Sequence, residues 1–370
     1  MIFLFIYLFK FTFLLFKGNK MKNFSLLFVL VLFAFAFNTI NSTAQTVVVT
    51  SPDGSSKTFN SIPEALNGAS DGDIVYLPAG SFDGNIVINK RLQIIGAGYN
   101  TKVRGADGVT YLTGSVRIVT GASGGSLQGV YISGEIRFGT DASNQKVDNY
   151  VISRCFVNFL YLGVTWDAEN TNDNILITEN IIEGAMFGAK ASNVKVIKNV
   201  LRQTSLLGRL ATRFKNAVFS NNIFIPLDDY PFNDVTGCIM QNNIITNGKF
   251  SNVNDFANNQ FLNNLYTSTD GLTTGGVVRS EGNVRMDLEE IFVNYKGGPL
   301  TFDDDYHLTQ KAIDAIKATD GGQVGLYGTD SPFKDYGIPV NPAIKEAKIS
   351  PMTNSKGQLK INFKVEAQSK

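Results

Sequence analysis

The chain has 370 residues, with 33 Lys and Arg against 32 Asp and Glu, so its net charge is +1 at neutral pH. This balance argues against nucleic acid as the main partner. Two cysteines are too few for a disulfide framework. The 35 glycines and 28 phenylalanines are typical of a chain with many turns around one long apolar core.

The first 44 residues predict a leader. Residues 21–44 have a charged start, an apolar run over 26–37 and small residues before Gln45, which is typical of a secretory signal peptide. Residues 1–20 are nearly all apolar, and we interpret them as a start codon assigned too far upstream. The alternative is an uncleaved membrane anchor. We therefore expect a secreted or cell-surface protein that starts near residue 45 and has no membrane contact after the signal is removed.

A strand and then a short helix are predicted next. Residues 46–51 are a β-branched run, and Ser61 can cap a helix whose first turn holds Pro63 and Glu64. Residues 74–77 follow as a strand after a Gly-Asp turn. Glycines at 96 and 98 follow a further strand, but no helical pattern comes after them. A dinucleotide-binding loop is therefore excluded.

One phrase occurs five times between residues 175 and 266. Each copy has an apolar residue three positions before an asparagine and another two positions after it, and the gaps between successive asparagines are 19, 23, 21 and 21 residues. The repeated asparagines are Asn180, Asn199, Asn222, Asn243 and Asn264.

A period near 20 residues with short β-type runs predicts one coil of a stack per repeat. Asparagine tolerates the left-handed backbone of a sharp bend, and its amide can bond to the coils above and below. Gly129 and Cys155 fall at the same position in looser, earlier coils. In this register Cys155 and Cys238 lie about four coils apart, too far for a bridge, and we expect both to be free and buried.

The residue after each repeated asparagine is also apolar. Because neighbouring strand positions point in opposite directions, this pattern predicts an aliphatic stripe outside the stack that something must cover. Our hypothesis is that the C-terminal tail, residues 341–370, covers it. The stripe consists of Ile181, Val200, Ile223, Ile244 and Leu265.

The C-terminal part predicts an end to the stack. Residues 275–286 have the pattern of a final coil, and residues 286–298 that of a short helical turn and loop. Residues 299–335 resemble the last segment of many secreted β-helix proteins. In the tail, residues 357–365 alternate as a strand.

Over about residues 46–335 the chain resembles the right-handed parallel β-helix proteins of the pectin-lyase-like superfamily. The repeated coils carry this resemblance, together with the opening helix, the Gly-Asp turn and the Pro-Ala-Gly and Gly-Ala-Gly phrases. It implies an all-β, single-stranded parallel β-helix over residues 45–340, capped by the opening helix, with residues 341–370 packed on it. That fold carries lyases, hydrolases, esterases, adhesins and non-enzymes.

Residues 184–227 hold seven basic residues and no acidic one. On a stack this block predicts a basic belt about two coils high, which would attract polyanions. The other interpretation is a solvated face that keeps the protein soluble. The candidate ligand-binding residues are Lys195, Lys198, Arg202 and Lys215, with Trp166, Tyr161 and Tyr230 as rings that could stack on sugars.

The lyase hypothesis needs a base and a cation beside a uronate carboxylate. By resemblance to β-helix lyases, Arg209 or Arg213 would be the base, and Asp228 with Asp229 would hold Ca²⁺. Adjacent strand positions point to opposite faces, which argues against Asp228 and Asp229 binding the same ion. The alternative interpretation is a surface loop.

The remaining candidate chemistry is sparse. His307 is the only histidine, and the Asp set of the β-helix hydrolases is absent. Residues 303–305 could bind calcium loosely or form a solvated turn. We therefore expect a monomer that engages extracellular polysaccharide, with acidic glycan preferred. The alternatives are a lyase that cleaves polyuronate by β-elimination and a structural or adhesive surface protein.

Overall fold

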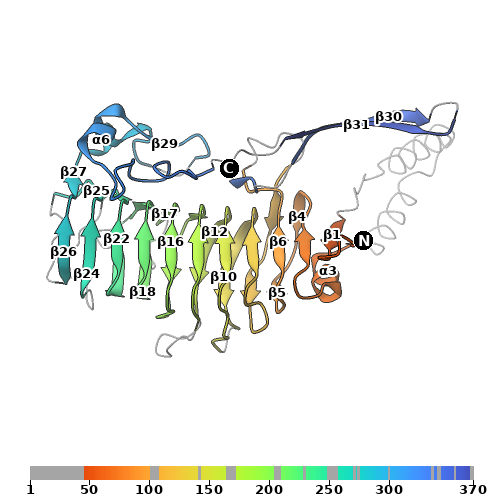
Figure 1. Cartoon of the computed structure of the whole chain (residues 1–370), viewed down its shortest axis with the longest axis horizontal. Helices are drawn as coiled ribbons and strands as arrows, with labels where there is room; N and C mark the ends of the chain where they lie inside the picture. The colour runs from red at the N-terminus through yellow and green to blue at the C-terminus, as the bar shows by residue number, and fades with distance from the viewer. Residues whose placement is uncertain are drawn as a thin grey trace, which may run out of the picture. The chain divides into compact units, whose positions relative to one another are not determined.

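The computed structural model (Figure 1) describes most of the chain after residue 45. The predicted leader, residues 1–44, lies outside the described residues. Described are residues 46–100, 108–140, 143–163, 172–203, 210–227, 231–247, 257–269, 272, 276–298, 301–334, 337–339, 343–353 and 356–366. Within these ranges no helix has the length and apolar character needed to cross a membrane.

Short strands stack into two long sheets, and all pairings in them are parallel except those of the first strand, so the prediction of an all-β parallel solenoid is confirmed. Its right-handedness stays a prediction. Sheet A, in spatial order, contains β2 (Ser56–Phe59), β1 (Val47–Thr50), β3 (Ile74–Tyr76), β6 (Gln93–Ile95), β9 (Ser126–Gln128), β11 (Val151–Ser153), β13 (Leu176–Thr178), β16 (Lys195–Ile197), β19 (Val218–Ser220), β22 (Ile239–Gln241), β24 (Asn259–Leu262) and β26 (Val277–Glu281).

Sheet B divides in two because β10 (Tyr131–Phe138) and β12 (Phe156–Tyr161) are long enough to pair with two strands on the same side. One branch holds β4 (Gly80–Phe82), β7 (Thr110–Leu112), β14 (Ile181–Ile182), β17 (Val200–Arg202), β20 (Ile223–Ile225), β23 (Ile244–Ile245), β25 (Leu265–Tyr266) and β27 (Val284–Arg285). The other holds β5 (Ile86–Ile88), β8 (Val116–Ile118), β15 (Met186–Phe187), β18 (Ala211–Lys215) and β21 (Phe232–Thr236).

The core runs through the stack as columns of apolar side chains. The residues three positions before each repeated asparagine pair vertically in sheet A, and all are fully buried. No single coil can bury such a face, so stacking supplies the core that each coil lacks. The column contains Ile177, Val196, Phe219, Met240 and Phe261.

The repeated asparagines form the predicted ladder. The Oδ1 of Asn222 accepts the backbone N–H of Asn199 at 2.9 Å, and its Nδ2 donates to Asn243 Oδ1 at 3.0 Å. The same pattern runs from Asn180 to Asn283. As predicted, Cys155 stands in this column, since its N–H donates to Asn180 Oδ1.

The sharp bend itself lies one residue earlier than the sequence analysis placed it. Positive φ angles occur at the residue before each ladder position, such as Lys198 at 55° and Asn242 at 57°. The ladder asparagines bond the coils and do not make the turn. Gly129, with φ of 70°, belongs to this bend column, so its assignment to the ladder column was wrong by one residue.

The described residues between 286 and 338, namely 286–298, 301–334 and 337–338, cover the aliphatic stripe and are here called the closing segment. The segment includes α5 (Leu288–Ile291), β28 (Phe292–Asn294), β29 (Asp305–Leu308) and α6 (Gln310–Ala315). The predicted stripe is buried, in a second apolar cluster that contains Ile291, Phe292, Leu308, Val324 and Leu326. The described cover is therefore the closing segment, whereas the hypothesis named the tail.

The closing segment runs back along the stack (Figure 1). The side chains of five bend residues bond to the backbone of this segment. The bonds join Asn263 Nδ2 to Lys317 O at 2.8 Å, Asn242 Oδ1 to Thr319 N at 2.9 Å, Asn221 Nδ2 to Gly325 O at 3.1 Å, Lys198 Nζ to Ser331 O, and Arg154 Nη1 to Ile338 O at 3.1 Å.

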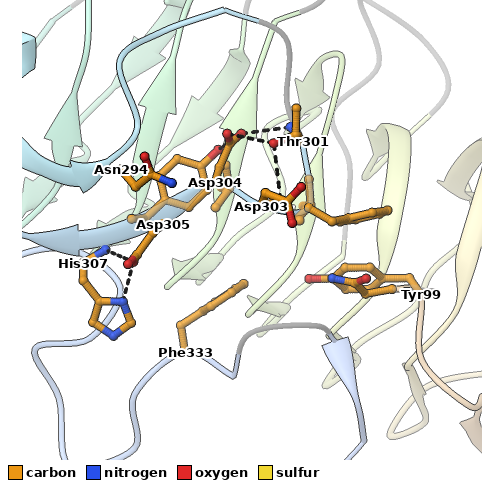
Figure 2. A pocket seen from close by; sticks show the side chains of 13 residues that line it. Tyr99, Asn294, Thr301, Asp303, Asp304, Asp305, His307 and Phe333 are labelled. Carbon is orange, nitrogen blue, oxygen red and sulfur yellow. Dashed lines mark hydrogen bonds and ion pairs between the residues drawn. The ribbon is translucent and has the colours of Figure 1, made fainter. Parts of the chain in front are cut away.

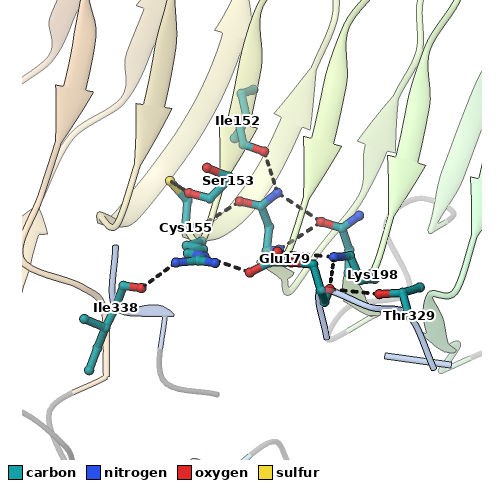
Figure 3. A network of polar contacts seen from close by, with 11 residues as sticks. Ile152, Ser153, Cys155, Glu179, Lys198, Thr329 and Ile338 are labelled. Atoms are coloured by element: carbon teal, nitrogen blue, oxygen red, sulfur yellow. Dashed lines mark hydrogen bonds and ion pairs between the residues drawn. The ribbon is translucent and has the colours of Figure 1, made fainter. Parts of the chain in front are cut away.

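Three of these bend residues form a buried ion-pair column (Figure 3). Glu179 Oε2 lies 2.7 Å from Arg154 Nε, and its Oε1 lies 3.4 Å from Lys198 Nζ. All three side chains are at most one-tenth exposed. Two cations share one carboxylate, and the carbonyls of the closing segment offset the second positive charge. The triad therefore fastens this segment to the stack.

The predicted elements at both ends are present. In α3 (Ile62–Gly68) the Ser61 hydroxyl caps the helix, and Ile62, Ala65 and Leu66 are buried in the core. Its role as a cap of the stack stays a prediction. In the tail, β30 (Ala343–Thr353) and β31 (Leu359–Glu366) form an antiparallel hairpin, and its packing on the solenoid likewise stays a prediction.

Candidate functional site

The outer face of sheet B carries a vertical row of side chains that we call the outer column. Parallel pairing aligns one outward position in each of seven coils. At about 4.8 Å per coil, the seven positions extend over about 29 Å. The outer column consists of Val87, Arg117, Arg137, Tyr161, Phe187, Thr212 and Asn233.

Strand alternation explains why these side chains point outward. In β10, Ile136 and Phe138 are fully buried in the core, so Arg137 between them faces out. In the same way Leu160 and Leu162 point in and Tyr161 points out. Val87 is half exposed, at 50 %, whereas Phe187 and Thr212 are buried, at 5 % and 6 %. The accessible part of the column is therefore its first four coils and Asn233.

The two arginines of the outer column share one carboxylate, that of Glu135. Glu135 Oε1 lies 2.7 Å from Arg117 Nη1 and 2.7 Å from Arg137 Nε. The three side chains are 18–19 % exposed, so these ion pairs are partly shielded from solvent. Two guanidinium groups therefore share this carboxylate. Because a guanidinium has five N–H donors, the contact with Glu135 does not use up the hydrogen-bonding capacity of Arg137.

Aromatic rings adjoin the arginines. The Arg137 guanidinium lies 4.3 Å from the ring centre of Tyr161, within cation–π range. Phe159 stacks on Tyr161 with centroids 6.1 Å apart. Burial raises the pKa of Tyr161, Glu135 raises it further and Arg137 partly opposes both, so the phenol remains protonated at neutral pH.

Arg213, a predicted base, lies beside the buried end of the outer column. Its guanidinium is 5.7 Å from the ring centre of Phe187, and its Nε is 3.3 Å from Asp234 Oδ2. The two groups are not aligned for a hydrogen bond, so the buried Nε of Arg213 has no hydrogen-bond partner. Arg213 also occupies a left-handed bend, with φ of 56°. The Arg213 guanidinium, which has one buried N–H without a hydrogen bond, therefore lies beside the ring of Phe187.

The structure separates the other predicted basic residues. Lys215 is exposed at the end of β18 on sheet B, whereas Lys195 is exposed on β16 of sheet A. Lys198 and Arg202 lie against the closing segment, where Arg202 Nη2 donates to Gly298 O at 2.9 Å. The basic block is thus divided among three surfaces. Its proposed ligand-binding role stays a prediction.

Five predicted site residues lie outside the described residues: Trp166, Arg209, Asp228, Asp229 and Tyr230. Their proposed roles in sugar stacking, base catalysis and calcium binding stay predictions. In the parts of the chain that are described, no group of three or more His, Cys, Asp or Glu side chains is placed to hold a metal ion.

Sequence reasoning missed Arg117 and Arg137 as neighbours of Tyr161. These residues belong to the looser coils, which lack the repeated asparagine, so no marker aligned them. A usable signal was the alternation in residues 131–138 and 156–161, which points Arg137 and Tyr161 outward. Their vertical pairing depends on register, and the coordinates supply it.

No protein-family model, no curated protein and no solved structure matches this chain. The class is therefore defined by the fold, a parallel β-solenoid.

Proposed function

We propose that this protein is a secreted, right-handed β-helix protein of the pectin-lyase-like type whose outer column engages an extracellular acidic glycan. The supporting observation is the pair Arg117 and Arg137, held in place by Glu135 beside the ring of Tyr161. Arginine binds carboxylate and sulfate groups through its planar fork, and an aromatic face packs on a sugar ring. The two arginines stand one coil apart and the ring of Tyr161 follows in the next coil, which suits an extended ligand.

The arrangement also limits the cost of binding. Glu135 and Tyr161 restrict the rotamers of Arg137, so less side-chain entropy is lost when a ligand is bound. The net charge of the whole chain is only +1, so long-range attraction of polyanions is weak and is screened by salt. Affinity should therefore come from an ordered row of contacts along the chain of the glycan.

The test is binding of the full-length mature protein to polygalacturonate and to a sulfated glycan, with neutral dextran as comparison. We expect binding to both acidic polymers, weakening with salt, and a loss of about tenfold or more in Arg137→Ala, as for removal of one charge-assisted contact. Arg137→Lys should lose most of the affinity as well, because it keeps the charge and removes the fork.

Arg279→Ala is the matched control, since Arg279 is an exposed, ion-paired arginine on β26 of sheet A. It should bind like the unmodified protein. Equal binding of dextran, or no effect of Arg137→Ala, would overturn the proposal. Release of unsaturated products from polygalacturonate would assign the lyase alternative, and absence of any binding would leave the structural or adhesive one.

A further inference from the structure

The tail is basic, whereas the rest of the chain is acidic overall. Residues 341–370 hold six lysines, two glutamates and no arginine or aspartate, so their net charge is +4. The other 340 residues together carry a net charge of −3. The charge of +1 for the whole chain therefore conceals a basic segment at its C-terminal end.

The described part of the tail forms a sheet of two strands (Figure 1). β30 and β31 pair with each other in antiparallel register and with no other described strand. At about 3.4 Å per residue, β31 extends over about 27 Å. A two-stranded hairpin is only marginally stable in water by itself. We therefore expect this hairpin to need a surface on which to pack.

Alternation divides the hairpin into an apolar and a polar face. Every second residue of β31 is apolar, and successive strand positions belong to opposite faces. Three of the four residues opposite them in β30 are apolar as well. The apolar positions are Leu359, Ile361, Phe363 and Val365, opposite Thr353, Ile349, Ala347 and Ile344. The polar positions of β31 are Lys360, Asn362, Lys364 and Glu366.

The tip of the hairpin adds an exposed apolar side chain. Met352, near the end of β30, is 76 % exposed, more than Val278 of β26 at 63 %. Lys356, in the turn that precedes β31, is exposed too. An apolar group and a cation therefore face solvent within four residues of each other at this tip.

The base of the hairpin is tied to the stack. Ile338 O accepts from Arg154 Nη1 at 3.1 Å, and a Cβ at Gly337 would lie 1.9 Å from the ring of Tyr99. Figure 2 shows Tyr99 at the wall of a cavity of about 400 Å³ between the closing segment and the stripe. The tail therefore starts at the bend column, whereas the outer column lies on the branch of sheet B that holds β15 and β18.

From these observations we infer that the tail hairpin docks on an anionic lipid surface and holds the protein at a membrane. The apolar face and Met352 enter the boundary between headgroups and acyl chains, and the lysines are attracted to the lipid phosphates. A polyanionic glycan would use the lysines alone and leave the apolar face in water, so it fits less of the hairpin. Membrane contact through the tail replaces the expectation of none, and it is independent of glycan binding by the outer column.

The experiment measures how the full-length mature protein partitions between water and lipid vesicles, by cosedimentation. Vesicles of phosphatidylcholine alone are compared with vesicles that contain about one-third phosphatidylglycerol. We expect the anionic vesicles to bind the protein about tenfold or more tightly, and added salt to weaken this binding. Arg137→Ala should partition like the unmodified protein, because it addresses a different surface.

The charge of the hairpin is tested by Lys360→Gln combined with Lys364→Gln. Loss of two cations should lower partitioning into anionic vesicles about tenfold or more. The matched control is Lys57→Gln combined with Lys195→Gln, because both lysines are exposed on strands of sheet A. It should leave partitioning unchanged.

The apolar part of the contact is tested by Met352→Gln, which should lower partitioning about tenfold because a buried apolar side chain is lost from the interface. Val278→Gln is the matched control, at an exposed apolar position of β26. Circular dichroism checks that each variant is folded, and if one of the two tail variants is not, the other decides.

Three results would overturn the inference: no binding of anionic vesicles, equal binding of both kinds of vesicle, or binding that the tail variants leave intact. Binding of polygalacturonate that the double lysine variant abolishes, without any vesicle binding, would also contradict membrane docking and assign the tail to a polyanionic glycan. None of these results bears on the outer column, which Arg137→Ala tests separately.

Discussion

Each ladder asparagine serves several buried hydrogen-bonding groups at once. Asn222 accepts from the N–H and the Nδ2 of Asn199, and it donates to Val196 O and to Asn243 Oδ1. A buried polar group that is not hydrogen-bonded is costly, so one side chain removes several penalties. This explains why the same residue type recurs although the backbone bend does not require it there.

Asn222→Ala should therefore lower the free energy of unfolding by several kcal/mol, at about 1–3 kcal/mol for each buried group left without a partner. Asn283→Ala is the control, because Asn283 is the last described member of the ladder and its bonds are only partly buried. Urea titration followed by circular dichroism measures both. Equal losses at the two positions would contradict the ladder's role.

The two cysteines are predicted to be inert in the folded protein. Both are free and buried, and burial raises the pKa of each thiol to about 12. At pH 8 only about one thiol in ten thousand would be ionised. Titration with a thiol reagent should give no reaction with native protein and two equivalents after denaturation. Rapid labelling of native protein would show that either side chain is accessible.

At the scale of elements, the closing segment and the stack depend on one another. The stripe that faces outward from sheet B is apolar and buried only because the closing segment lies over it. Five residues of the bend column then bond to the backbone of that segment. Exposed apolar stripes of this length promote association, so the cover is needed for a soluble protein.

Truncation tests that dependence. A mature chain that ends at residue 340 keeps the closing segment and should remain monodisperse, with a melting temperature close to that of the full chain. A chain that ends at residue 285 exposes the stripe and should aggregate. Size-exclusion chromatography distinguishes the two outcomes. A soluble, stable product ending at residue 285 would contradict the assigned cover.

The sequence predicts the coils far better than it predicts their cover. The repeated asparagine and its apolar neighbours recur within about 20 residues, so local pattern alone aligns the strands. The contact between Asn242 and Thr319 spans 77 residues and belongs to no repeat, so nothing in the pattern indicates it. The residues of the predicted basic belt lie on different surfaces because the sequence block does not show which way each side chain points. Lys198 is at a bend and contacts the closing segment, whereas Lys195 lies on a strand of sheet A.

At the scale of the whole molecule, stacking turns residues far apart in sequence into neighbours. Arg117, Arg137 and Tyr161 lie about 20 residues apart along the chain and one coil apart in the outer column. A binding face built this way is long and regular, with equivalent positions repeated at about 4.8 Å. It should therefore recognise the length of a glycan as well as its charge.

Affinity for acidic oligosaccharides of increasing length, measured by calorimetry, tests this claim most directly. The accessible column from Val87 to Tyr161 extends over about 14 Å. Affinity should rise with each added sugar until the oligosaccharide spans that distance, then level off, and Arg137→Ala should remove the rise. Affinity that is the same for a single sugar and for longer chains would contradict the outer column as the glycan site.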